Sequence, residues 1–140
     1  MLGNPAAPNR RSHYRRFFQL ILSMEKGASW QGVYTLMEDF PELTCILCDI
    51  GIHSVDRYTW PLLETYKNLY LDTSLLTLGY GHLEATVKKF RAERILFGSG
   101  FPERYPEGPA CEVLHSGISE KDREKISHLN LEKIISGVKL

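Results

Sequence analysis

The chain has 140 residues, 17 basic and 17 acidic side chains and a hydrophobic fraction of 43%, so its formal net charge is zero. This length fits one domain with a sizeable core, and the balanced charge does not favour binding to nucleic acid or to a membrane surface. No apolar run is long enough to cross a bilayer. The three cysteines, an odd and low number, suit the reducing cytoplasm, where we expect the protein to reside.

The N-terminal part predicts a disordered tail followed by a strand and a helix. Residues 1–13 are rich in Pro, Asn and Ala, a composition typical of disorder, so we assign the folded domain to residues 14–140. Phe17–Ser23 is a continuous apolar run that predicts a buried strand, with a helix left open as the alternative because its apolar residues also fit helical spacing. Ser29 is suited to cap a helix that Pro41 ends.

Two more strand and helix pairs follow. Leu43–Cys48 and Leu69–Asp72 are short apolar segments that predict strands. Between them, Asp56 is suited to cap a helix in which Pro61 is tolerated only near the first turn. After the second strand, residues 83–90 carry an apolar stripe that predicts a third helix.

The C-terminal part predicts one more strand, a long loop and two helices. Ile95–Phe97 is the fourth strand, and the prolines and glycines of residues 102–109 predict a loop. Ser119 opens a helix with a capping-box pattern. Asn130 is suited to cap a last short helix, which Gly137 ends.

Cys45 and Cys48 have the C-x-x-C spacing of redox and zinc motifs. They lie in a predicted strand, however, where residues three apart point to opposite faces. The sequence has no second pair of this kind that would complete four zinc ligands. We therefore interpret both cysteines as structural.

Strands and helices alternate about four times with short connections, which predicts an α/β fold with a parallel sheet and right-handed crossovers. The strands are apolar throughout, as in a sheet buried on both faces. Four such units correspond to half of an eight-unit TIM barrel, which typically needs about 250 residues. A half-barrel is expected to leave two sheet edges open.

The order and spacing of several short segments resemble the C-terminal half of the amidohydrolase-related proteins, metal-dependent hydrolases and decarboxylases with a TIM-barrel fold. The resemblance covers about Ser29 to Ile135 and would make the four strands the fifth to eighth of the barrel. It rests on Phe40-Pro41-Glu42-Leu43, Lys67-Asn68-Leu69-Tyr70-Leu71-Asp72-Thr73-Ser74, Glu93-Arg94-Ile95-Leu96-Phe97-Gly98-Ser99-Gly100-Phe101-Pro102 and Asp122-Arg123-Glu124-Lys125-Ile126.

The usual divalent metal site of that family, commonly zinc, has no counterpart in this sequence. Family members carry an H-x-H pair on the first strand, which lies in the half that this chain does not contain. Family members place a histidine after the fifth strand, where this chain has Ser23-Met24-Glu25. Several of them place another histidine after the sixth strand, where this chain has Asp49. Gly100 stands where they place an aspartate after the eighth strand. We therefore expect no metal ligands and no cofactor in this chain.

Five residues are candidates for a site at the barrel mouth, where the strands end. Asp49 and Asp72 lie at the ends of two predicted strands and are the candidate acid and base groups. Asp49 is also a candidate metal ligand, beside which His53 could bind the same metal. His53, Ser99 and Arg104 lie in the following loops and are candidate substrate-binding residues. The Gly98–Gly100 turn also has backbone amides suited to hold an anion.

Two functions remain open from the sequence. By resemblance, the chain is a hydrolase-family domain that acts on a small amide or carboxylate at the barrel mouth by hydrolysis or decarboxylation, and we expect the isolated chain to be inactive, as a fragment or a pseudoenzyme. The alternative is a non-catalytic half-barrel that self-associates or pairs with a missing N-terminal half. A homodimer that closes the half-barrel is the partner expected in that case.

Overall fold

The computed structural model describes residues 19–24, 26–51, 55–74 and 80–137. Four strands alternate with helices in chain order, as the sequence predicts. The elements are β1 (Gln19–Ser23), α1 (Trp30–Asp39), β2 (Thr44–Cys48), a π-helical turn (Val55–Thr59), α2 (Trp60–Thr65), β3 (Leu69–Asp72), α3 (His82–Phe90), a 3₁₀ turn (Ala92–Arg94), β4 (Ile95–Leu96), α4 (Glu107–His115), α5 (Glu120–Glu124), a second π-helical turn (Lys125–Leu129) and α6 (Asn130–Ser136).

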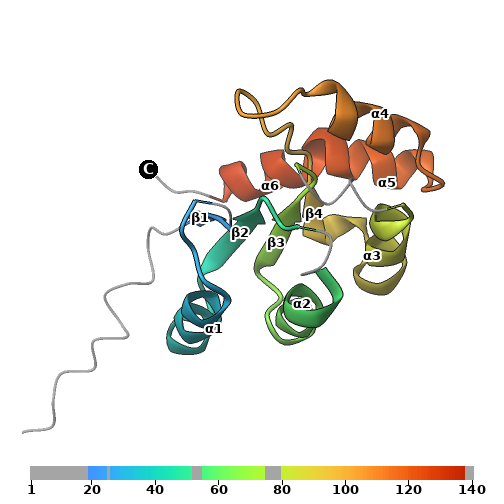
Figure 1. Ribbon diagram of the computed structural model, residues 1–140. Helices are drawn as coiled ribbons and strands as arrows, with labels where there is room; N and C mark the ends of the chain where they lie inside the picture. Colours follow the sequence, from blue (N-terminus) through green and yellow to red (C-terminus); the bar gives the residue numbers. More distant parts are fainter. Residues whose placement is uncertain (1–18, 25, 52–54, 75–79, 138–140) are drawn as a thin grey trace, which may run out of the picture.

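The four strands form one open, parallel sheet in the order β1-β2-β3-β4. Each strand therefore lies beside the next one in the chain, and α1, α2 and α3 all cover the same face (Figure 1). In a doubly wound sheet the helices that connect the strands would lie on both faces. Here α1, α2 and α3, which connect consecutive strands, lie on one face only, which is the arrangement of part of a TIM barrel.

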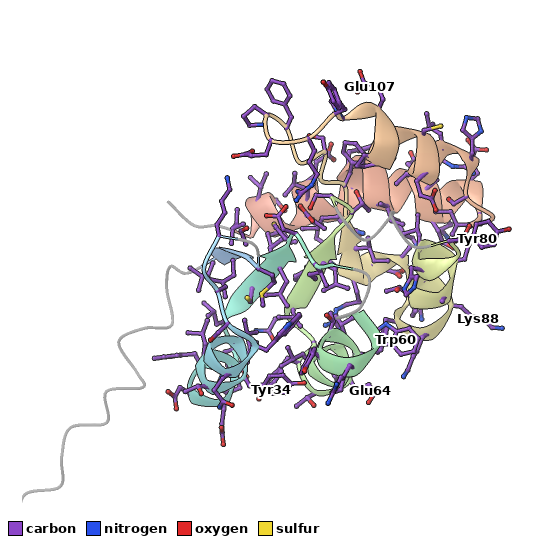
Figure 2. All side chains as sticks on the ribbon, in the orientation of Figure 1. Tyr34, Trp60, Glu64, Tyr80, Lys88 and Glu107 are labelled. Carbon is purple, nitrogen blue, oxygen red and sulfur yellow. The ribbon has the colours of Figure 1, made fainter. Side chains whose placement is uncertain are left out.

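The core on the helical face joins alternate residues of the strands to the apolar stripes of the helices. Cys45 and Leu47 of β2 are fully buried there against Val33 and Met37 of α1. Tyr34 extends from α1 toward α2 (Figure 2) and donates a hydrogen bond of 2.9 Å to the carbonyl of Tyr58. Cys45 and the partly buried Cys48 lie on opposite faces of the sheet, as predicted for residues three apart on a strand.

The other face of the sheet is covered in part by α6 (Figure 1), which packs Ile134 against Ile46 and Leu96. The helical segment that leads into α6 crosses the outer edge of β4. Asn130 Nδ2 donates to the Ile95 carbonyl at 2.8 Å, and the Phe97 N–H donates to the Ile126 carbonyl at 2.9 Å. The prediction of two open edges is therefore wrong for β4, because a helix satisfies the backbone groups that a neighbouring strand would bind.

Most local predictions are confirmed. The first predicted segment is a strand rather than a helix, described from Gln19 onward. The hydroxyl oxygens of Ser29 and Ser119 accept hydrogen bonds from the N–H groups of Gly32 and Asp122 and cap α1 and α5, and Gly137 ends α6. The side chain of Asp56, the other predicted cap, lies outside the described part of the structure.

Two local predictions are wrong. Gly108 and Pro109 belong to α4 instead of a loop, since a proline in the first turn of a helix replaces an N–H that has no partner within the helix. Asn130 lies inside a continuous helical segment and caps nothing. Its buried side chain instead donates to the carbonyls of Ala92 and Ile95. Among the described residues, no helix is both long and apolar enough to span a bilayer.

Candidate functional site

The C-terminal ends of the strands surround an open cleft of about 400 Å³. In a parallel α/β fold this end of the sheet is where ligands bind. The cleft is lined by Lys26 after β1, by Cys48 and Asp49 at the end of β2, by Asp72 and Ser74 at the end of β3, and by residues 97–101, 103 and 104 after β4.

Asp49 is held in a strained backbone conformation by a dense set of contacts. Its φ angle is 57°, in the left-handed region that residues other than glycine rarely adopt. Its carboxylate accepts hydrogen bonds from Ser23 Oγ at 2.5 Å and from Arg104 Nη1 at 2.7 Å. Burial alone would raise the pKa of Asp49, but the hydrogen bonds from Ser23 and Arg104 and the charge of Arg104 outweigh it and lower the pKa. Such strain persists where surrounding contacts determine the conformation, often at functional sites.

Asp72, the last residue of β3, has the opposite electrostatic environment. Its Oδ1 accepts hydrogen bonds from Ser74 Oγ at 2.6 Å and from the Ser74 N–H at 3.1 Å. Burial raises the pKa of Asp72, the nearby charge of Asp49 adds to the increase, and the hydrogen bonds from Ser74 and Cys48 only partly oppose it. The thiol of Cys48 is in turn held in its neutral form, because burial and the charge of Asp72 raise its pKa.

Gly98 is the residue that makes room for the Asp72 carboxyl group. A Cβ atom at position 98 would lie 2.6 Å from Cγ and 3.0 Å from Cβ of Asp72, with Oδ2 closer still. The Asp72 carboxyl group therefore packs directly against the backbone at the end of β4. Thr73 fixes the same junction, since its Oγ1 is 3.0 Å from both the carbonyl oxygen and the amide nitrogen of Gly98.

The loop after β4 turns back over the cleft. Gly100 has a φ angle of 73°, in the left-handed region that glycine adopts without strain. Arg104 then reaches Asp49 at the end of β2, and Glu103 accepts a hydrogen bond from Lys26 after β1. Ser99 lines the cleft, and its Oγ accepts a hydrogen bond from the Phe101 N–H at 3.3 Å.

The structure brings four of the five predicted site residues, Asp49, Asp72, Ser99 and Arg104, into one cleft. The fifth, His53, lies outside the described residues. Ser74 and Lys26 also line the cleft and were not among the predicted site residues. Ser74 lies two residues after Asp72, a spacing at which an Asp side chain often bonds the backbone, and this is the local signal for it. Lys26 has no local signal, because its partner Glu103 is 77 residues away.

The described residues do not fit the divalent metal of the barrel family. Both oxygens of Asp49 are engaged by Ser23, Ser74 and Arg104, and the guanidinium group of Arg104 would repel a cation at this position. Gly100 provides no ligand, and the described part of the chain holds no group of three or more His, Cys, Asp or Glu side chains that could bind a metal. We therefore derive no chemistry through a metal at this cleft.

The arrangement suits proton transfer to an anion. Asp49 and Asp72 have pKa values moved in opposite directions, and Ser74 Oγ lies 2.6 Å from Asp72 Oδ1 and 3.4 Å from Asp49 Oδ1. Pairs of carboxyl groups with separated pKa values are typical of acid and base roles. Two cationic side chains, Arg104 and Lys26, line the same cleft.

Comparison with solved structures finds proteins that share this fold. The chain is similar to 2,6-dihydroxybenzoate decarboxylase from Rhizobium over 72% of its length, with 20% identity and a TM-score of 0.56. It is similar to an uncharacterized TIM-barrel protein from Bordetella bronchiseptica over 76% of its length, with 22% identity and a TM-score of 0.59. It also matches a protein of Staphylococcus aureus proposed to be an amidohydrolase over 76%, with 21% identity and a TM-score of 0.56.

These likenesses show that part of the chain has the fold of part of a TIM barrel. The matched part is 37–39% of the length of each of those proteins. No family model matches the sequence, and no curated protein matches it at a significant level.

Proposed function

We propose that the cleft at the ends of β2, β3 and β4 binds a small carboxylic acid and that Asp72 exchanges a proton with it, as in a decarboxylation. The observation that supports this is the pair of carboxyl groups with opposite pKa shifts, Asp49 and Asp72, in one cleft with Arg104. The fold shared with a decarboxylase is compatible with such a substrate.

Two cationic side chains at the rim are available to an anionic ligand, although three carboxyl groups, those of Asp49, Asp72 and Glu103, line the same cleft. Arg104, in the loop after β4, and Lys26, in the loop after β1, both line the cleft. Each of them already contacts one carboxylate, Asp49 or Glu103, so a ligand carboxylate would share or exchange these partners. The Ser99 hydroxyl provides a further polar contact.

Decarboxylation fits these carboxyl groups better than hydrolysis. When the bond to the substrate carboxyl group breaks and CO₂ leaves, the electron pair stays on carbon, which must then take up a proton. Asp72 in its protonated form supplies that proton, becomes a carboxylate and regains a proton from water, and its raised pKa keeps a larger fraction of it protonated. Hydrolysis needs a base to activate water, and the lowered pKa of Asp49 makes it a weak base.

We further propose that residues beyond this chain complete the catalytic site. The matched structures are more than twice as long as the part that this chain covers, and a barrel site is built from the ends of several strands. The isolated chain is then expected to bind the acid without turning it over. Activity of the hydrolase family stays a proposal for the complete assembly.

The test is a titration of the chain with 2,6-dihydroxybenzoate, followed by the NMR shifts of its backbone amides. We expect shifts at Ser99 and Gly100, and an affinity roughly tenfold lower in Arg104→Ala, because a charge-assisted hydrogen bond is lost. Lys88→Ala removes the same charge from an exposed side chain that does not line the cleft, and it serves as the matched control, which should bind as the wild type does. Shifts confined to other regions, or equal affinity in Arg104→Ala, would exclude this cleft as the binding site.

A non-catalytic role in self-association has separate support at β1, the edge of the sheet opposite β4. β1 pairs with β2 on one side, and its Ile21 is 66% exposed on the face away from α1. Two copies joined at β1 would form one continuous sheet around a two-fold axis. A homodimer that closes the half-barrel also stays a prediction, and it requires the helical segment to leave the β4 edge. Sedimentation showing a monomer at all concentrations, for the wild type as for Ile21→Lys, would refute both dimers.

A further inference from the structure

A second cleft lies at the opposite end of the strands from the proposed active site. It has a volume of about 320 Å³ and is formed by residues before and within β3, by residues just before β4 and by the C-terminal helical segment, residues 125–136. Its lining is mainly cationic: Lys67, Arg94, Lys125 and Lys133 face a single carboxylate, Glu93.

Arg94 gives this cleft a fixed positive charge. Its guanidinium group donates to the carbonyl oxygens of Leu63 at 3.3 Å, Tyr66 at 2.5 Å and Leu69 at 2.6 and 2.8 Å. These carbonyls hold the group rigidly but carry no net charge. No carboxylate among the described residues pairs with Arg94, so its charge is not neutralised although the side chain is half-buried.

The other charged side chains of this cleft do not neutralise the positive charge of Arg94. Lys125 Nζ is paired with Glu93 Oε1 at 2.9 Å and with Asp122 Oδ1 at 3.2 Å, which accounts for the one carboxylate that lines the cleft. Lys67 and Lys133 are exposed and form no ion pair with any carboxylate of the described residues. Three cationic groups therefore share a concave surface without a counter-charge, in a chain whose net charge is zero.

We propose that this cleft binds a small phosphate-bearing anion. The ammonium groups of Lys67 and Lys133 are of the kind that proteins use to bind phosphate. Arg94 adds its charge, although most of its N–H groups already donate to carbonyls, and a multivalent anion would neutralise several of these charges at once. The volume lies at the lower end of the range for small-molecule sites, about 300–1,000 Å³. A short phosphorylated metabolite fits this space, whereas a nucleic acid strand needs an extended basic groove.

This site is separate from the proposed active site. The two clefts share no lining residue, and Asp49 and Asp72 take no part in it. Failure of phosphate binding would therefore leave the proposed proton transfer at Asp72 untouched, and the converse also holds.

Isothermal titration with inorganic pyrophosphate at constant ionic strength tests the site. We expect the double variant Lys67→Ala/Lys133→Ala to bind at least about tenfold more weakly, because two charge-assisted contacts are lost. The matched control, Lys88→Ala/Lys121→Ala, changes the net charge equally at exposed lysines that do not line the cleft, Lys88 projecting from α3 (Figure 2). It should bind as the wild type does.

Thermal unfolding gives a second measure, since a ligand that binds only the folded state raises the melting temperature. Pyrophosphate should raise it in the wild type and the control but not in Lys67→Ala/Lys133→Ala. No binding by the wild type, or equal weakening in both double variants, would overturn the proposal. Tighter binding of a single-stranded oligonucleotide than of pyrophosphate would overturn it as well, because the site would then be a surface for a polyanion.

Discussion

Gly98→Ala tests whether the Asp72 carboxyl group is held against the end of β4. The added methyl group would lie 2.6 Å from Cγ of Asp72 and 3.0 Å from its Cβ. Neither distance is compatible with van der Waals contact, so the Asp72 side chain or the backbone of one strand must move. The hydrogen-bonded junction between Thr73 and Gly98 opposes a backbone shift.

The expected loss of stability is about 1–3 kcal/mol. Overpacking a well-packed site costs about 1–3 kcal/mol. Rotation of the carboxyl group out of the way would relieve that strain but would break the hydrogen bonds from Ser74, which lie at 2.6 and 3.1 Å. Hydrogen bonds to a charged group contribute about 1.5–3 kcal/mol each and those between neutral groups about 1. Either response therefore costs at least about 1 kcal/mol.

Urea unfolding followed by the fluorescence of Trp30 and Trp60 measures this loss. Gly108→Ala is the matched control, because a Cβ at position 108 meets nothing within 4 Å. That change lies in α4 and should be neutral or stabilising by up to about 1 kcal/mol. The double variant Gly98→Ala/Asp72→Ala should recover at least about 1 kcal/mol relative to additivity, because the carboxyl group that the methyl group meets is absent.

Two outcomes would refute this picture of the site. A loss below about 0.5 kcal/mol in Gly98→Ala would mean that the carboxyl group does not occupy the space beside the strand, since that is the size of an ordinary surface change. Additive losses in the double variant would mean that the cost of the methyl group arises from some other neighbour. In either case Asp72 would not have the packed environment from which its proposed proton-donating role is argued.

Three further changes have defined outcomes. Arg91→Gly should stabilise the protein by about 1 kcal/mol in urea unfolding, because Arg91 has φ 71° and ψ 155°, a conformation that essentially only glycine adopts without strain; a loss of stability would contradict this. Asn130→Ala should destabilise it by about 2–3 kcal/mol, since two buried carbonyls lose their partner, and amide hydrogen exchange around β4 should accelerate; unchanged exchange would show that the side chain does not secure this edge. Asp72→Asn tests the raised pKa. The folded protein holds the Asp72 proton above the pH at which the unfolded chain releases it, so this group lowers stability as pH rises from the ordinary carboxyl pKa to the raised one. The free energy of unfolding of Asp72→Asn minus that of the wild type should therefore be larger at pH 7 than at pH 4. A difference that does not change with pH would exclude the raised pKa of Asp72.

The sequence by itself determined the order and type of most elements, because their signals are local. Apolar runs and cap residues such as Ser29 and Ser119 act within a few positions, so they predicted the four strands and the helices between them. Alternation of strand and helix then implied a parallel sheet. The position of Asp49 and Asp72 at strand ends also followed, since the carboxyl ends of parallel strands meet at one edge.

Only the tertiary structure decided the chemical environment of those residues. The partners of Asp49 are Ser23 and Arg104, 26 and 55 residues away, and no local pattern links them. The different pKa values of two similar carboxyl groups depend on burial and neighbouring charge, which the sequence does not encode position by position. The same holds at β4, where Asn130 satisfies the strand edge instead of capping a helix. Local chemistry predicts the elements, whereas the distances between them, set by packing of the whole chain, decide what the side chains at their ends can do.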